Sequence, residues 1–194
     1  MQTLSKTLNQ ALTALLLMLA SSLAMAELEP VRIQAYIASL DEVRVLGKEL
    51  KAEGKEAFLA GQIMPREGQS FDPHQRAVSA LKRDEPAYYS KLESSVVKNG
   101  FTSPESWAQT GDQVVLAYGA VKVAAESPQI LAMAAQSGPE QDMLLMALPE
   151  KQRAQLKQAL LIAKALAAVP EADRAAVKPY IGTLDTVFTE EGLQ

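Results

Sequence analysis

The stretch GFTSPESWAQTGDQVVLAYGAVKVAAESP, residues 100–128, decides the fold class. Thr102 or Ser103 can cap a helix with Pro104 in its first turn, because hydroxyl groups accept hydrogen bonds from free N–H groups and proline fits that turn. Four apolar or aromatic side chains follow at spacings of 7, 4 and 3 residues, which places them on one helix face: Trp107, Val114, Tyr118 and Val121. We expect a helix ending near residue 126. Trp107 and Tyr118 should face the core, with a ligand-binding aromatic wall as the alternative.

Helical periodicity also marks the segment 31–55. Its apolar residues recur every three or four positions and form one stripe: Ile33, Ile37, Leu40, Val43, Leu46 and Leu50. Ser39 followed by Glu42 is a capping-box pattern, so the segment is either one helix or two.

The segment 59–71 shows neither the helix nor the strand period and contains glycine and proline, so it is expected to be a loop. Asp72 and Pro73, with Gln75 three residues after Asp72, predict the start of a helix. Asp84 predicts the start of the next helix, which ends at the Asn99-Gly100 pair.

Prolines punctuate the rest of the chain at residues 128, 139, 149, 170 and 179. Proline can open a helix but costs about 3 kcal/mol inside one, so this spacing predicts short helices that fold back on one another. The expected helices are 129–136, 140–147, 150–168, 171–177 and 180–190. We therefore expect a single all-α domain, a compact array of about eight short to medium helices.

The first 26 residues have the pattern of a secretory signal peptide. Lys6 precedes an apolar run over 11–20, which is shorter than the roughly 20 residues that span a bilayer. Ala24 and Ala26 supply the small side chains that a signal peptidase requires, so cleavage is expected between Ala26 and Glu27. No cysteine follows the run, which excludes a lipoprotein. The expected product is an exported domain over 27–194, periplasmic in a Gram-negative bacterium.

Composition excludes several functions. The net charge of the whole chain is -4, and losing Lys6 makes it -5, whereas nucleic acid requires a basic surface. With no cysteine and one histidine, the common zinc sites cannot form, and no acidic loop typical of calcium sites or glycine-rich phosphate loop is present. A catalytic triad would have to use His74, and no Gly-x-Ser-x-Gly turn presents a nucleophile. We expect no metal and no cofactor.

The pair Glu126-Ser127 resembles the Glu-Ser pair of lytic transglycosylases, which cut cell-wall glycan, and LAYGA at 116–120 is similar to their Ala-Tyr-Asn-Ala-Gly motif. The resemblance implies Glu126 as a catalytic acid. Here, however, the Ala-Tyr motif precedes the glutamate instead of following it, and the downstream Gly-Leu-Met-Gln segment is missing. Without a second placed acid, the pair is better explained as the end of one helix and the cap of the next.

The segment LPEKQRAQLKQ, residues 148–158, resembles the Leu-Thr-x-x-Gln signature of periplasmic chaperones related to Spy. Pro149 stands where that family has threonine, and one copy is visible where the family has two. The resemblance implies a chaperone or a structural protein of the envelope as an alternative function.

Methionine is unusually frequent between residues 131 and 148. Met133, Met143 and Met146 predict either gap filling in the core or an adaptable apolar binding surface. The following helix carries lysines and an arginine beside a wide apolar arc, which favours burial in a bundle over contact with a membrane. The sequence thus indicates a non-enzymatic protein that binds a protein partner or a hydrophobic ligand.

Overall fold

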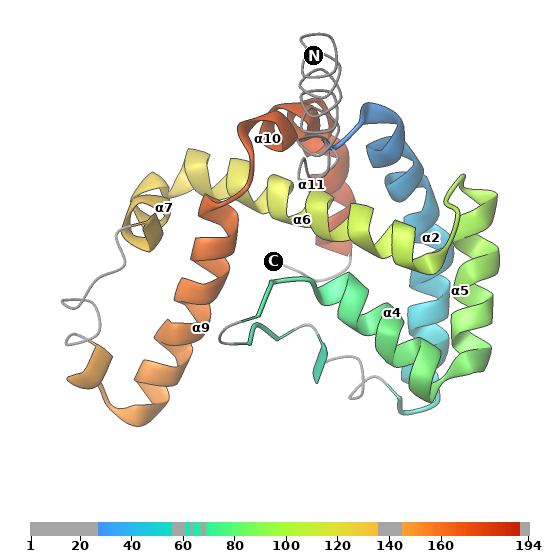
Figure 1. Ribbon diagram of the computed structural model, residues 1–194, viewed down its shortest axis with the longest axis horizontal. Coiled ribbons are helices and arrows are strands. Elements are labelled where there is room, and N and C mark those ends of the chain that lie inside the picture. The colour runs from blue at the N-terminus through green and yellow to red at the C-terminus, as the bar shows by residue number, and fades with distance from the viewer. Residues whose placement is uncertain (1–26, 56–60, 63, 67–68, 136–144, 191–194) are drawn as a thin grey trace, which may run out of the picture.

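The computed structural model describes residues 27–55, 61–62, 64–66, 69–135 and 145–190, and all regular structure within them is helical (Figure 1). The all-α prediction is confirmed for this part of the chain. The predicted signal peptide, parts of the 59–71 segment and most of the predicted helix 140–147 lie outside the described residues. None of the described helices combines the length and apolar content that a membrane-spanning helix requires.

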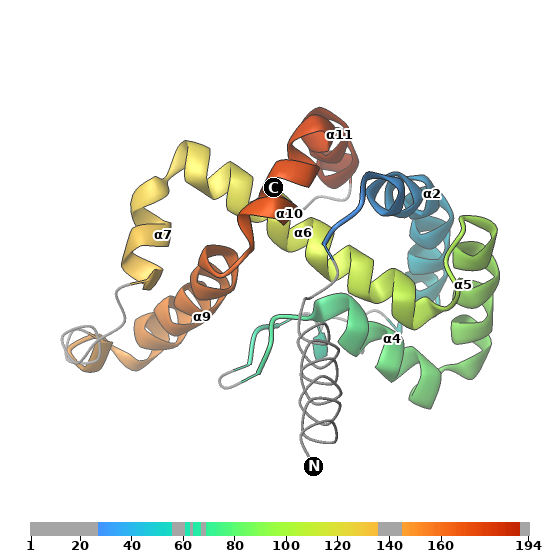
Figure 2. The same ribbon diagram turned by 45° about the horizontal axis from the view of Figure 1, so that its top comes forward.

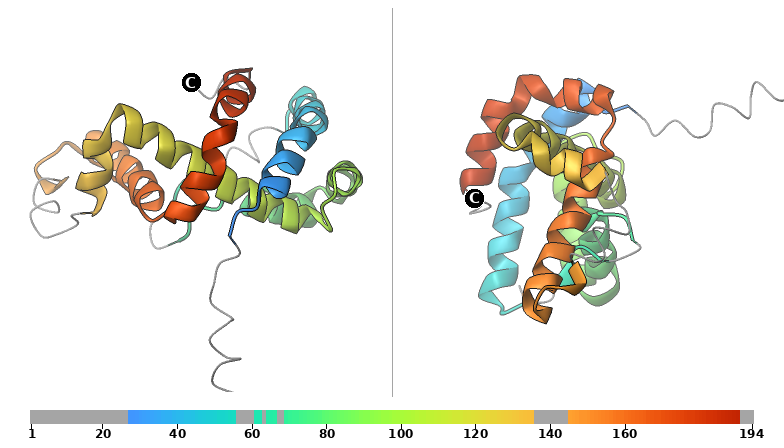
Figure 3. Two further views of the ribbon diagram at one scale, coloured as in Figure 1. Left: turned by 90° about the horizontal axis from the view of Figure 1, so that it is seen from above. Right: turned by 90° about the vertical axis from the view of Figure 1, so that its left-hand side faces the viewer.

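Helix α6, Pro104–Glu126, runs through the length of the molecule (Figure 3). Ser103 caps it as predicted: its hydroxyl accepts the N–H of Ser106 at 3.1 Å, and the Ser106 hydroxyl accepts the N–H of Ser103 at 3.2 Å. Small buried residues let neighbouring helices approach the α6 backbone closely: Ala108, Gly111, Ala117 and Ala120. The central helix therefore organises the other elements around it.

Three helices pack around the N-terminal half of α6 and form, together with it, what we call the body. They are α2, Pro30–Ala52, α4, Pro73–Asp84, and α5, Pro86–Lys98. Of the two alternatives for the 31–55 segment, the structure shows one continuous helix, and Ser39 does not cap a second helix. Its buried hydroxyl instead donates to the carbonyl of Tyr36 at 2.6 Å and accepts from the indole nitrogen of Trp107 at 2.8 Å.

The boundary between α4 and α5 lies one residue later than the sequence predicts. Asp84 is the last residue of α4, and Glu85 stands at the cap position before Pro86 without a capping side-chain hydrogen bond. The Asp84 carboxylate is instead paired with the guanidinium of Arg83. The predicted end of α5 is confirmed, since Gly100 has a φ of +87°, a conformation that glycine adopts without strain.

At the other end of α6 the chain turns into α7, Pro128–Ala135, and returns in α9, Glu150–Ala167. These two helices pack against each other and stand away from the body, as Figure 2 shows. We call these two helices, together with the described residues 145–149 that lead into α9, the arm. The prediction that α9 is buried in a bundle holds only for its C-terminal half, where Leu166 is buried and Ile162 packs against the core, whereas Leu156 is exposed. No third described helix covers its N-terminal half.

The chain then returns to α6 through α10, Glu171–Val177, a short 3-10 turn, Lys178–Tyr180, and α11, Ile181–Glu190. Helix α10 packs on both α6 and α2. It also holds the start of the described chain, because the carboxylate of buried Asp173 accepts the N–H of Leu28 at 3.0 Å. Leu28 itself is buried in the core.

Candidate functional site

A buried carboxylate on α6 holds the N-terminus of α4. Asp112 is only 4% exposed. One of its oxygens accepts the backbone N–H of His74 at 2.8 Å and lies 2.9 Å from the ring nitrogen Nδ1 of His74. The other oxygen accepts the backbone and side-chain N–H groups of Gln75 at 3.2 and 3.1 Å. Asp72 was predicted to cap α4, but its side chain makes no capping bond, and Asp112 takes this role.

The second ring nitrogen of His74, Nε2, lies 2.9 Å from the hydroxyl of Tyr36. With Nδ1 donating to Asp112, Nε2 accepts the phenolic proton. The ring of Trp107 lies 5.4 Å from that of His74 and 5.8 Å from that of Tyr36. An aspartate, a histidine and a hydroxyl thus form a row, as in a catalytic triad. Tyr36 is 1% exposed, however, so its hydroxyl cannot meet a substrate, and the row connects α2, α4 and α6.

A groove of about 670 Å³ opens beside this cluster, between α6, α9 and the segment before α4. From α6 it is lined by residues that recur at the spacing of one helix face: Gln109, Asp112, Gln113 and Leu116. The lining has the same spacing on α9 and at the residue that follows it: Leu161, Lys164 and Ala165, then Ala168. The groove therefore has an amide-rich side on α6 and a largely apolar side on α9.

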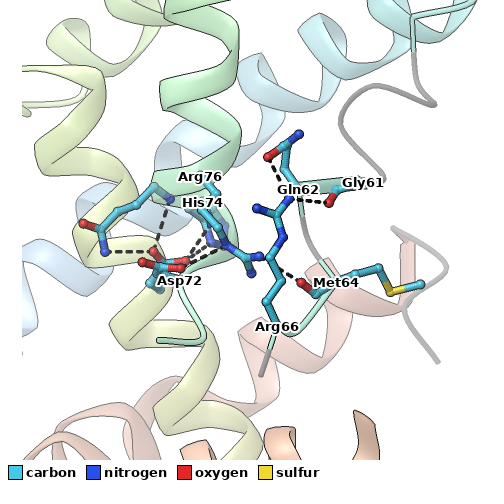
Figure 4. Close-up of polar contacts among 9 residues, drawn as sticks. Gly61, Gln62, Met64, Arg66, Asp72, His74 and Arg76 are labelled. Atoms are coloured by element: carbon cyan, nitrogen blue, oxygen red, sulfur yellow. Dashed lines mark hydrogen bonds and ion pairs between the residues drawn. The ribbon is translucent and has the colours of Figure 1, made fainter. Parts of the chain in front are cut away.

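The third wall of the groove comes from residues 65–66 and 69–72, and contacts of this segment are drawn in Figure 4. Arg76 joins this segment to α4: it donates to the carbonyl of Met64 at 2.8 Å and pairs with the Asp72 carboxylate at 3.0 Å. Arg66 donates to the carbonyl of Gly61 at 3.2 Å. Arg76 thus holds the segment against α4, whereas the Arg66 bond lies within the predicted 59–71 loop, of which residues 61–62 are helical.

The arm presents apolar side chains to solvent. Met133 on α7 is 58% exposed and Met146 is 74% exposed, while Met143 lies outside the described residues. Ile130 and Leu156 of the arm are also exposed. Four cations and one anion occur on α9, so the charged residues around these apolar groups are mostly basic: Glu150, Lys151, Arg153, Lys157 and Lys164.

The two aromatic residues of the predicted α6 stripe differ in exposure. Trp107 is 5% exposed and belongs to the core. Tyr118 is half-buried and donates its hydroxyl to the Asp185 carboxylate at 2.6 Å. Burial, together with that carboxylate, raises the pKa of Tyr118 to about 12. The hydrogen bond in turn lowers the pKa of Asp185. Neither aromatic side chain lines the groove.

Glu126 is the last residue of α6 and is largely exposed. Its carboxylate lies 3.2 Å from Nζ of Lys122, which also lies 3.3 Å from the Asp185 carboxylate. Hydrogen bonds to Glu126 and Asp185 raise the pKa of Lys122. The predicted helix end at Glu126 is confirmed, and Ser127 connects it to α7.

Within the described part of the chain, no three His, Asp or Glu side chains gather as a metal site would require. No protein-family model, curated protein or solved structure matches this chain. Its function must therefore be argued from the groove and the arm.

Sequence reasoning missed the residues that shape the groove. Gly111-Asp112 interrupts an otherwise apolar stretch of a predicted helix, and this was the available signal, since a carboxylate there must find buried donors. Lys164 gave no such signal. It belongs to a helix with several basic residues, and only the packing of α9 beside α6 distinguishes it from the others.

Proposed function

We propose that this chain is an exported, non-enzymatic binding protein of the Gram-negative periplasm. It consists of one domain of about eight helices after cleavage between Ala26 and Glu27. Its arm binds an apolar surface on a protein partner. Binding through the arm requires neither a metal nor a cofactor.

The observation that carries this proposal is the exposure of the methionines on the arm. Met133 and Met146 are more than half exposed, although the body buries most of its large apolar residues. Methionine is flexible and polarisable, so it adapts to partners of different shape and is frequent on surfaces that bind several proteins. Ile130 and Leu156 of the arm are exposed as well, and exposed apolar surface is typical of interaction sites when it forms one patch.

The charge of the arm supports a protein partner with an acidic rim. Lys151 and Lys157 are exposed beside the apolar residues, and Arg153 is fixed by donating to the carbonyl of Leu148 at 2.9 Å. Long-range attraction between such cations and an acidic surface accelerates association, while the apolar contact supplies most of the affinity.

The test is site-specific photo-crosslinking in the periplasm. A photoreactive amino acid replaces Met133 or Met146, and matched controls carry it at Val31 or Val97, which are 63% and 50% exposed on the body. We expect one discrete adduct from both arm positions and none from the controls. The double substitution of Met133 and Met146 by glutamine should prevent its formation, as monitored through a third probe at Ile130. Equal labelling from all four positions would contradict the proposal.

A further inference from the structure

We propose that the groove between α6 and α9 is a second binding site, which takes a linear apolar chain that ends in an anionic head group. This inference does not rest on the function proposed for the arm. It follows from the volume of the groove, from the chemistry of its two sides and from the way its charges are compensated.

The groove has the size and lining of a small-molecule site. Its volume of about 670 Å³ falls within the range of roughly 300–1,000 Å³ that is usual for such sites. Leu116 and Leu161 contribute apolar side chains from facing helices, and Val169, which is 7% exposed, closes the end toward α10. An alkyl chain placed there would cover apolar surface that water now contacts, and this burial favours binding.

The carboxylates of the groove already have partners. Asp72 is ion-paired with Arg76, and Asp173 accepts the N–H of Leu28. Asp112 accepts donors from His74 and Gln75 on both of its oxygens. These three groups are therefore poorly suited to attract a cationic ligand.

Among the described residues, the cations of the groove have no such compensation. Arg66 is bound to neutral oxygens, with its closest contact to the carbonyl of Gly61 at 3.2 Å. Lys164 has no carboxylate within ion-pair distance among the described residues, and it lies on the α9 face between Leu161 and Ala168. A positive charge embedded in an apolar helix face provides a partner for an anion whose chain lies along that face. The exposed amide of Gln109 adds a further donor from α6.

The experiment is isothermal titration calorimetry of the mature protein with three probes that share one chain: dodecanoate, dodecyl phosphate and dodecylammonium. We expect saturable one-to-one binding of at least one anion, and binding of the cation at least about 10-fold weaker, which corresponds to about 1.4 kcal/mol. The anion that binds more tightly identifies the head group. Equal affinity for the anions and the cation, or no saturable binding, would overturn the proposal.

Two variants locate the site. Lys164→Gln should weaken binding of the preferred anion about 10-fold, whereas Lys151→Gln, on the same helix but outside the groove, should leave it unchanged. Ala165→Phe should fill the groove and reduce binding of every probe. Unchanged fluorescence of buried Trp107 shows that each variant is folded. Full affinity in both Lys164→Gln and Ala165→Phe would place the binding elsewhere and overturn the assignment.

This outcome is separable from that of the arm. Replacing Met133 and Met146 leaves the groove lining intact, so dodecanoate binding should persist in that variant. Conversely, the crosslinked adduct of the arm should persist in Lys164→Gln.

Discussion

A Cβ atom added at position 111 would lie 2.8 Å from Cε2 of Tyr36 and 3.0 Å from Cδ2 of His74. Both rings are held by hydrogen bonds, so neither can move away easily. Overpacking of this kind costs about 1–3 kcal/mol, and the better helix propensity of alanine returns up to about 1 kcal/mol. We expect Gly111→Ala to lower the free energy of unfolding by about 1–2 kcal/mol, measured by denaturant titration of Trp107 fluorescence.

The matched control is Gly47→Ala on α2. A Cβ atom there would have no neighbour within 4 Å, so only the helix propensity changes and the variant should gain about 0.5–1 kcal/mol. Equal stabilisation by both substitutions would contradict the close packing of α2 and α4 against α6 at Gly111.

Two aspartates near the start of α4 should differ strongly in their contribution to stability. Asp112→Asn replaces one accepting oxygen by an amide that faces the donors of Gln75 or His74, and it removes a buried charge-assisted cap. We expect a loss of about 2–4 kcal/mol in the free energy of unfolding. Asp72→Asn removes only a partly exposed ion pair with Arg76 and should cost less than about 1 kcal/mol. Thermal unfolding of both variants shows whether α4 is capped by Asp112, which is distant in the sequence, or by the adjacent Asp72. A larger loss of stability in Asp72→Asn than in Asp112→Asn would contradict capping by Asp112.

Among the helices, one ion pair between α4 and α6 makes stability depend on pH. The Glu105 carboxylate accepts hydrogen bonds from Nζ of Lys82 at 2.7 Å and from the hydroxyl of Tyr89 at 2.9 Å. The Lys82 ammonium is the main cause that lowers the pKa of Glu105 to about 2 from its ordinary 4.5. Because the folded pKa is the lower one, the stabilisation is complete above about pH 4.5 and is lost as the pH falls toward 2.

Glu105→Gln should therefore destabilise the protein at pH 7, by no more than about 1 kcal/mol because the pair is exposed. The difference from the parent protein should shrink through the acidic range and vanish near pH 2. Denaturation at a series of pH values measures this, and Lys82→Gln in the same series completes a double-mutant cycle. A difference that stayed constant with pH would show that the ion pair is not its source.

The helix boundaries could be predicted where the signal is local. Ser103 and Pro104 open α6, Gly100 ends α5, and Pro170 precedes α10, because capping and φ preferences act over a few residues. The start of α4 was also predicted, but for the wrong reason, since its cap comes from Asp112. Groove residues such as Lys164 could not be predicted, because they come together only through the packing of helices that lie far apart in the sequence.

At the scale of the whole molecule, the arm should be less stable locally than the body. No residue of α9 between 150 and 159 is buried, whereas α6 buries side chains along most of its length. Helices with few buried contacts open at lower free energy than the core. In hydrogen exchange measured by mass spectrometry, amides of 150–159 should exchange before those of α6. Equal protection of the two segments would mean that another surface covers the arm in solution.

The bond between the N–H of Leu28 and the carboxylate of Asp173 joins residues 145 positions apart. A ribosome delivers Leu28 first and Asp173 near the end, so this closure must wait for almost the entire polypeptide. Contacts of such long range slow folding, because the chain entropy is lost before the contact forms. If the chain is exported through a membrane from its N-terminus, as we propose, that delay leaves the segment after Ala26 accessible to a peptidase until synthesis is nearly complete.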